Sequence, residues 1–267
     1  MTRKDLVAVL EDVLREGDTL IEKGLEVTLV ASETIMLGAR AVNARAIRVL
    51  ADYHVDDQVA VIVRSLVEAA VDVEYLNTRT VRRLGGDREV ELTPDIKSLL
   101  FSSHKPVALF NIVTEAEELE PDDPLPDEIA ANLPEGIWDR VREARTEALQ
   151  MRERLGLRES PYWACAGSAA MMAELRRALP EEAGRLRQHR RFFQDFSFFA
   201  HANPNDTPYV VQPSGKLRSS FREDSILGAA VIAAVEVYRW WGVVLGDEMR
   251  PRFIGYLRRL GGEAPDL

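Results

Sequence analysis

Apolar positions recur with a period near 3.6 residues along most of the chain, which predicts amphipathic α-helices. In residues 5–26, for example, Leu6, Val9, Leu10 and Val13 begin an apolar stripe. Long helices are expected at 5–26, 28–53, 58–84, 92–120, 137–155, 181–202 and 219–247, with short ones at 168–179 and 251–260. The pattern therefore predicts an all-α fold, a single multi-helix bundle of about seven to eight helices that forms one domain over residues 1–267.

A few segments depart from the helical pattern. Residues 115–128 hold eight acidic side chains and no basic one, and with the prolines among them they predict a solvated acidic loop over about 115–136. Pro106 is expected to break or kink the helix that contains it. Weak alternation at 88–92 and 209–212 indicates two short strands that either pair with each other or stay irregular.

The most apolar stretch of the chain is residues 226–235. Its ten residues are fewer than the about 20 that span a bilayer, so a helix buried on all sides is expected and no membrane partner. Residues 1–18 contain acidic side chains in their first turns, which predicts an amphipathic helix and not a signal peptide.

Composition and charge narrow the classes of function. Apolar residues make up 46% and charged residues 29% of the 267, as in an ordinary globular protein. The net charge of 34 − 44 = −10 repels phosphate backbones, so duplex DNA is not an expected partner. The single cysteine, Cys165, excludes an intramolecular disulfide and fits a reducing, cytoplasmic location.

Known cofactor and metal signatures are missing from the sequence, which has no P-loop, no HExxH and no CxxC. His54 with Asp56 and Asp57 is the densest local group of metal-ligand types, and we interpret it as helix-cap residues at a turn. No cofactor and no metal are therefore predicted.

Two helices carry polar residues within apolar surroundings. Arg64, Glu68 and Asp72 are spaced four apart and share one stripe of the 58–84 helix. Because its other residues are mostly apolar, Arg64 and Glu68 are expected to be at least partly buried and paired.

The second polar stripe lies on the aromatic 181–202 helix. Its members, again four apart, are His189, Phe193, Ser197 and His201. Ser197 and His201 are expected to point inward, where His201 needs a partner such as Glu68 or Arg64. Asn203 follows directly, and either caps the helix or reaches the same place.

At these positions the chain resembles a family of bacterial helical proteins with no established activity. The resemblance covers residues 58–260 and rests on three motifs, R-S-L-V-E-A-A-V-D-V-E-Y-L at 64–76, P-Y-W-x-x-x-G-S at 161–168 and F-x-x-x-S-x-x-x-H at 193–201. The residues that match the characteristic positions of the family are Arg64, Glu68, Trp163, Ser197 and His201.

A looser resemblance is to HEPN domains, helical bundles of toxin–antitoxin and phage-defence systems. Catalytic HEPN domains are metal-independent ribonucleases that use an Arg and a His four to six residues apart on one helix, usually facing a dimer partner. This chain departs from that pattern, since nine residues separate Arg191 from His201. A ribonuclease here would have to combine Arg64 and His201 from different helices.

Two functions remain open. In an enzyme, a metal-independent ribonuclease or other hydrolase, His201 would be the general acid/base, Arg64 would stabilise a developing anion and Ser197 would position a hydroxyl or water. Glu68 would be the charged partner of His201, while Tyr162, Trp163 and Asn203 would contact an RNA or small-molecule substrate. A Ser197–His201 nucleophile pair is a third, weaker idea, because it lacks an oxyanion turn.

In the alternative, the protein is a non-catalytic helical scaffold that binds a partner or ligand, and the polar cluster fixes helix packing. The basic run Arg185, Arg187, Arg190 and Arg191 either guides RNA or is a solvated helix face, the interpretation we favour. The helix around 226–244, with Trp240 and Trp241, is either a homodimer face or plain core.

Overall fold

A computed structural model describes residues 1–26, 31–53, 56–85, 87–119, 136–158, 160, 162–201, 209–211, 217–219, 223–245 and 250–261. Backbone contacts divide the chain into two compact units. Unit 1 comprises Met1–Asn77 and Leu175–Leu267, and unit 2 comprises Thr78–Glu174. The sequence-based expectation of one domain over 1–267 stays a prediction, and each unit is described by itself.

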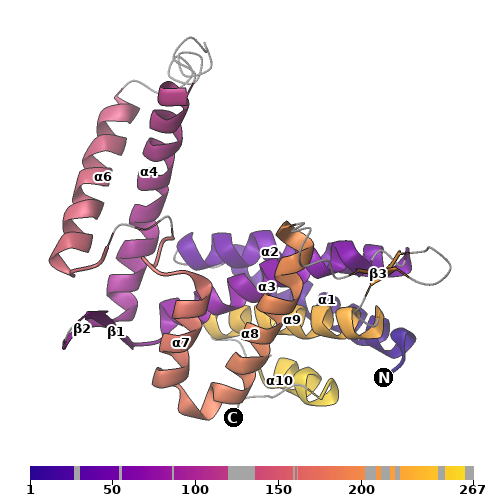
Figure 1. Cartoon of the computed structure of the whole chain (residues 1–267). Coiled ribbons are helices and arrows are strands. Elements are labelled where there is room, and N and C mark those ends of the chain that lie inside the picture. The colour runs from indigo at the N-terminus through magenta and orange to yellow at the C-terminus, as the bar shows by residue number, and fades with distance from the viewer. Residues whose placement is uncertain are drawn as a thin grey trace. The chain divides into compact units, whose positions relative to one another are not determined.

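Unit 1 is built around a helix that is apolar on nearly every side, α9 (Glu223–Leu245). It packs against α1 (Arg3–Glu26), α2 (Ala31–Asp52), α3 (Asp56–Asn77) and α10 (Arg250–Arg259), as Figure 1 shows. Residues from Ile226 to Trp241 are almost all buried, and each Leu, Ile or Val among them contributes roughly 1.5–3 kcal/mol. The prediction of a fully buried helix at 226–235 is confirmed.

α3 also packs against α8 (Ala183–His201), which follows the short 3-10 turn η1 (Pro180–Glu182). Unit 1 also contains a small antiparallel hairpin of β3 (Tyr209–Val211) and β4 (Leu217–Ser219). Thus α3 contacts α2, α8 and α9, and charged residues on its buried faces can pair with residues of those helices.

A glycine allows α1 to approach α9 closely. A Cβ atom on Gly17 would lie 2.3 Å from the Tyr238 ring, well inside van der Waals contact. That ring is itself fixed, because it stacks on Phe253 of α10 at 6.1 Å between centroids. The contact joins three helices of unit 1 at one point.

Unit 2 begins with an antiparallel hairpin of β1 (Thr80–Gly85) and β2 (Arg88–Leu92). Two long helices follow and pack side by side, α4 (Pro94–Leu119) and α6 (Ile137–Arg154). The chain then passes through a turn into α7 (Ser168–Ala178), which crosses from unit 2 into unit 1.

The all-α class is confirmed, with nine α-helices in the part of the chain that is described, slightly more than the seven to eight expected. The predicted helix over 58–84 is wrong beyond Asn77, where β1 begins three residues later. Alternation explains the change, since Thr80 and Arg82 are buried while Val81 and Arg83 are exposed. Gly85, at φ 119°, supplies the positive φ at the end of β1.

Three further expectations are corrected. The strands at 88–92 and 209–211 pair with their own neighbours and not with each other. The helix α4 continues through Pro106 without a break and includes 115–119, which were expected in the acidic loop. The rest of that loop, 120–135, lies outside the described residues.

One helical segment of the described chain, Ser225–Val243, is long and apolar enough to cross a membrane by length and composition. Within its most apolar window, 89% is buried inside the protein, which is the position of a core helix. Trp240 and Trp241 belong to this core. The helix is therefore part of the core, and the expectation of a homodimer stays a prediction.

Candidate functional site

The predicted pair of Arg64 and Glu68 is present on α3. Their charged groups lie 3.5 Å apart, with 18% of the Arg64 side chain and 32% of the Glu68 side chain exposed. Both residues are therefore partly buried, as the sequence predicts. Water still screens the pair, so its contribution to stability is small, about 0–1 kcal/mol.

Arg64 also connects the two predicted polar stripes. Its guanidinium lies over the ring of Phe193 on α8, 4.9 Å from the ring centre, a cation–π contact. Phe193 precedes Ser197 and His201 by one and two helical turns, and all three belong to α8. The side chains of Ser197 and His201, and the whole of Asn203, lie outside the described part of the structure. Their meeting with Arg64 stays a prediction.

The two predicted aromatic contacts, Tyr162 and Trp163, belong to unit 2, whereas Arg64 and Glu68 belong to unit 1. Trp163 is 8% exposed and packs edge-to-face on Phe101 of α4, with 5.3 Å between ring centres. It is a core residue of unit 2, while Tyr162 is exposed. A role for either in substrate binding stays a prediction.

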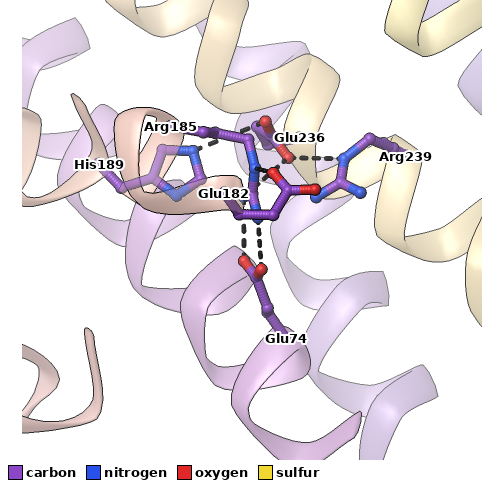
Figure 2. Close-up of polar contacts among 6 residues, drawn as sticks. All are labelled: Glu74, Glu182, Arg185, His189, Glu236 and Arg239. Atoms are coloured by element: carbon purple, nitrogen blue, oxygen red, sulfur yellow. Dashed lines mark hydrogen bonds and ion pairs between the residues drawn. The ribbon is translucent and has the colours of Figure 1, made fainter. Parts of the chain in front are cut away.

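A larger polar group lies deeper in unit 1, and we call it the buried charge network: Glu74, Glu182, Arg185, His189, Glu236 and Arg239 (Figure 2). Arg185 of α8 donates from both terminal nitrogens to the carboxylate of Glu74 on α3, in one case at 3.0 Å. Its Nε donates to Oε2 of Glu182 at 2.8 Å. One guanidinium thereby joins α3, η1 and α8.

Glu236 of α9 forms the other half of the network. Its Oε2 accepts a 2.8 Å hydrogen bond from Nε of Arg239 and lies 3.7 Å from Nη1 of Arg185. Its Oε1 lies 3.7 Å from Nε2 of His189, one helical turn beyond Arg185. The network therefore links α3, α8 and α9.

Burial and charge act against each other at these groups. Burial alone would raise the pKa of Glu236, but Arg239 and Arg185 outweigh it and hold that pKa well below its ordinary value. Burial alone would lower the pKa of Arg185, but Glu236 and Glu74 outweigh it and raise that pKa. Both groups are therefore charged at neutral pH.

The network is almost fully buried except at Glu182, whose side chain is 17% exposed. Glu74, His189 and Glu236 are each 1% exposed, and Arg185 and Arg239 are 2% exposed. Some of its hydrogen-bonding atoms are unsatisfied. Nδ1 of His189, Oε1 of Glu236 and Nη2 of Arg239 have no hydrogen-bond partner among the described residues. Most of its charged groups are paired with one another, so the network joins α3, α8 and α9 through their side chains.

The sequence interpretation missed this network and is wrong about Arg185. Arg187, Arg190 and Arg191 are exposed as expected for a solvated face, but Arg185 is buried. A signal was present: Arg185 and His189 extend the stripe of Phe193, and Glu236 and Arg239 sit in a helix with few other polar residues. Charges so placed must pair across helices.

Unit 2 has a polar interior of its own. Arg82 of β1 forms two hydrogen bonds with Glu174, at 2.7 and 3.2 Å, and a third at 2.6 Å with the carbonyl oxygen of Ala164. Lys97 of α4 is fully buried and donates to the carbonyl oxygen of Thr78 at 2.5 Å. Burial lowers the pKa of Lys97 to about 7.

No protein-family model, curated protein or solved structure was found to match this chain. Within the described residues, no three His, Cys, Asp or Glu side chains are grouped so as to hold a metal ion. His54 lies outside those residues. Function must therefore be argued from the geometry of this chain alone.

Proposed function

We propose that this protein is a non-catalytic helical binding protein, in which the buried charge network fixes how α3, α8 and α9 pack. The observation that carries the proposal is the Arg185–Glu74 pair, whose members are 2% and 1% exposed and face each other from two helices. A pair so placed satisfies its two charges internally, and it specifies one helix register.

The free-energy cost of burying these charges supports a role of the network in selecting one helix packing. Desolvating two charges costs several kcal/mol for each ion, and their attraction only about offsets that cost. Apolar residues of similar size would be equally stabilising there. The network is therefore expected to select one packing of three helices that are otherwise largely apolar, because any other packing leaves Glu236 or Arg185 unpaired.

An activity screen tests the proposal. Wild type, Arg64→Ala and His201→Ala are incubated with single-stranded RNA and with ester substrates, and the melting temperature of each is measured. The proposal expects no turnover above background in any of the three. Turnover by the wild type that His201→Ala abolishes, with an unchanged melting temperature, would overturn it.

The second candidate is a metal-independent ribonuclease or other hydrolase of a toxin or phage-defence system. It is favoured by one observation, the placement of the partly exposed Arg64 over Phe193, at the start of the stripe that leads to Ser197 and His201. In this hypothesis His201 is the general acid/base and contributes about 10²–10⁴-fold. The same screen would show that loss in His201→Ala.

The location and the binding partners of the protein are proposed from its sequence and from the exposed residues of α8. One cysteine suits a reducing, cytoplasmic compartment, and the net charge of −10 disfavours binding to duplex DNA. A small molecule fits the proposed binding role better than RNA, because the basic run on α8 contributes only three exposed arginines, Arg187, Arg190 and Arg191.

A further inference from the structure

Arg152, near the end of α6 in unit 2, is a buried cation without a partner among the described residues. Its side chain is among the largest that are fully buried, with 1% exposed. Nε, Nη1 and Nη2 all lack a hydrogen-bond partner within the described part of the chain. A guanidinium has five N–H donors, so this group leaves all of them unused.

The other buried arginines of the described chain behave differently. Arg82, Arg185 and Arg239 each donate to a carboxylate, of Glu174, Glu74 and Glu236 respectively. An unpaired buried ion costs several kcal/mol, and an arginine cannot escape that cost by losing its proton. Among the described residues, Arg152 is therefore the buried arginine that lacks an anionic partner.

Two partly exposed residues of unit 2 lie within electrostatic range of Arg152. His104 on α4 has a buried Nδ1 that also lacks a partner among the described residues. Burial lowers the pKa of His104 and the charge of Arg152 lowers it further, so its imidazole is neutral at neutral pH and can donate one hydrogen bond. Cys165 is the second, and burial raises the pKa of its thiol while the charge of Arg152 acts in the opposite direction.

The backbone at Cys165 is unusual. Cys165 has a φ of 52°, the only positive φ at a non-glycine residue of the described chain. Such a conformation costs about 1–3 kcal/mol and persists where the surroundings impose it. Arg82 donates to the carbonyl oxygens of Ala164 and Cys165, which holds this turn in place.

The whole interior of unit 2 has an excess of positive charge. Its buried charged side chains in the described chain are Arg82, Lys97, Arg152 and Glu174. Their sum is 3 − 1 = +2, or +1 when Lys97 has lost its proton. A chain with a net charge of −10 thus keeps an uncompensated cationic interior in one unit. An anionic ligand would compensate it.

We propose that Arg152, His104 and the turn at Cys165 form a binding site for a small molecule with a compact oxyanion, a carboxylate or a phosphoryl group. The planar fork of Arg152 binds two oxygens of such a group, and His104 donates to a third or to the same oxygen. The proposal deepens the binding role proposed above and rests on it. The site uses no residue of the buried charge network, so the two proposals fail in separate experiments.

Binding is tested by calorimetry and thermal denaturation of the full chain in chloride buffer of constant ionic strength. Inorganic phosphate and acetate are the probes, and they separate a phosphoryl from a carboxylate site. Arg152→Met is compared with Arg154→Met, which removes an exposed arginine two residues away on α6. We expect the wild type and Arg154→Met to gain melting temperature saturably with at least one anion. Arg152→Met should lose about tenfold to a hundredfold in affinity for it.

A measurement on the wild type covers the case in which Arg152→Met does not fold. Cys165 is the only thiol, so its rate of modification by a thiol reagent reports on this place alone. Because the charge of Arg152 favours the thiolate, a bound anion should slow the reaction about threefold relative to chloride of equal ionic strength. The proposal is overturned if neither anion raises the melting temperature or slows this reaction, or if Arg152→Met and Arg154→Met bind the anions equally.

Discussion

The guanidinium of Arg185 donates two hydrogen bonds to the carboxylate of Glu74, a residue 111 positions earlier in the chain. Both side chains are sealed inside unit 1, and the contact fixes α8 on α3. The pair of Arg64 and Glu68 differs, since its members lie four residues apart on one helix, α3, and are partly exposed to water. The contrast predicts different consequences for variants of the two pairs.

Neutralising Glu236 should be far more damaging than neutralising Glu68. Glu236→Gln leaves Arg239 and Arg185 with less negative charge in a sealed interior, and we expect a loss of about 3–5 kcal/mol in the free energy of unfolding. Glu68→Gln disturbs a solvated pair and should cost about 0–1 kcal/mol. Urea denaturation of both variants measures the difference. Equal losses would mean that the network is not sealed.

Glu236 should also make the protein sensitive to acid. Its pKa in the folded protein lies below the ordinary 4.5, so as the pH falls through 4.5 the unfolded chain takes up a proton that the folded protein does not. Stability from this group is complete above that pH and declines below it. The difference in free energy of unfolding between wild type and Glu236→Gln should therefore shrink from pH 6 to pH 3. A constant difference would show that the pKa is not lowered.

Lys97 should make the free energy of unfolding increase with pH in the alkaline range. Between its folded pKa of about 7 and its ordinary 10.5, the unfolded chain holds a proton that the folded protein lacks. Stability therefore rises with pH over that interval, by up to about 1.4 kcal/mol per pH unit, and does not change further below pH 7. Lys97→Met removes this dependence. Chemical denaturation from pH 7 to pH 10 should show the wild type gaining on the variant, and parallel curves would refute the prediction.

Gly17 should not tolerate a methyl group. Alanine is the better helix former by about 1 kcal/mol, yet its Cβ would meet the buried Tyr238 ring at 2.3 Å. We expect Gly17→Ala to destabilise the protein by about 1–3 kcal/mol. Gly228→Ala is the matched control, because a Cβ there meets nothing within 4 Å in another helix. The control should be neutral or slightly stabilising, and a neutral Gly17→Ala would place α1 farther from α9.

The period of the apolar positions predicted most of the helices, because residues with that spacing lie on one face of the chain only when it is an α-helix. It failed at 80–92, where a short hairpin forms. Buried and exposed residues alternate there over only a few positions, which is too short a pattern to stand out in the sequence. For the candidate site, it found the i,i+4 pair of Arg64 and Glu68, since both members lie on one helix. It could not find Arg185 with Glu74 or the isolation of Arg152, because both depend on which helices meet.

The central claim, that the buried charge network serves packing, is tested most directly by a double-mutant cycle on Glu74 and Arg185. Glu74→Met and Arg185→Met alone each leave an unpaired buried charge and should each lose about 3–5 kcal/mol in the free energy of unfolding, measured in urea. The double variant should recover most of that loss, with a coupling energy of several kcal/mol. Losses in the two single variants that simply add in the double variant would contradict the claim.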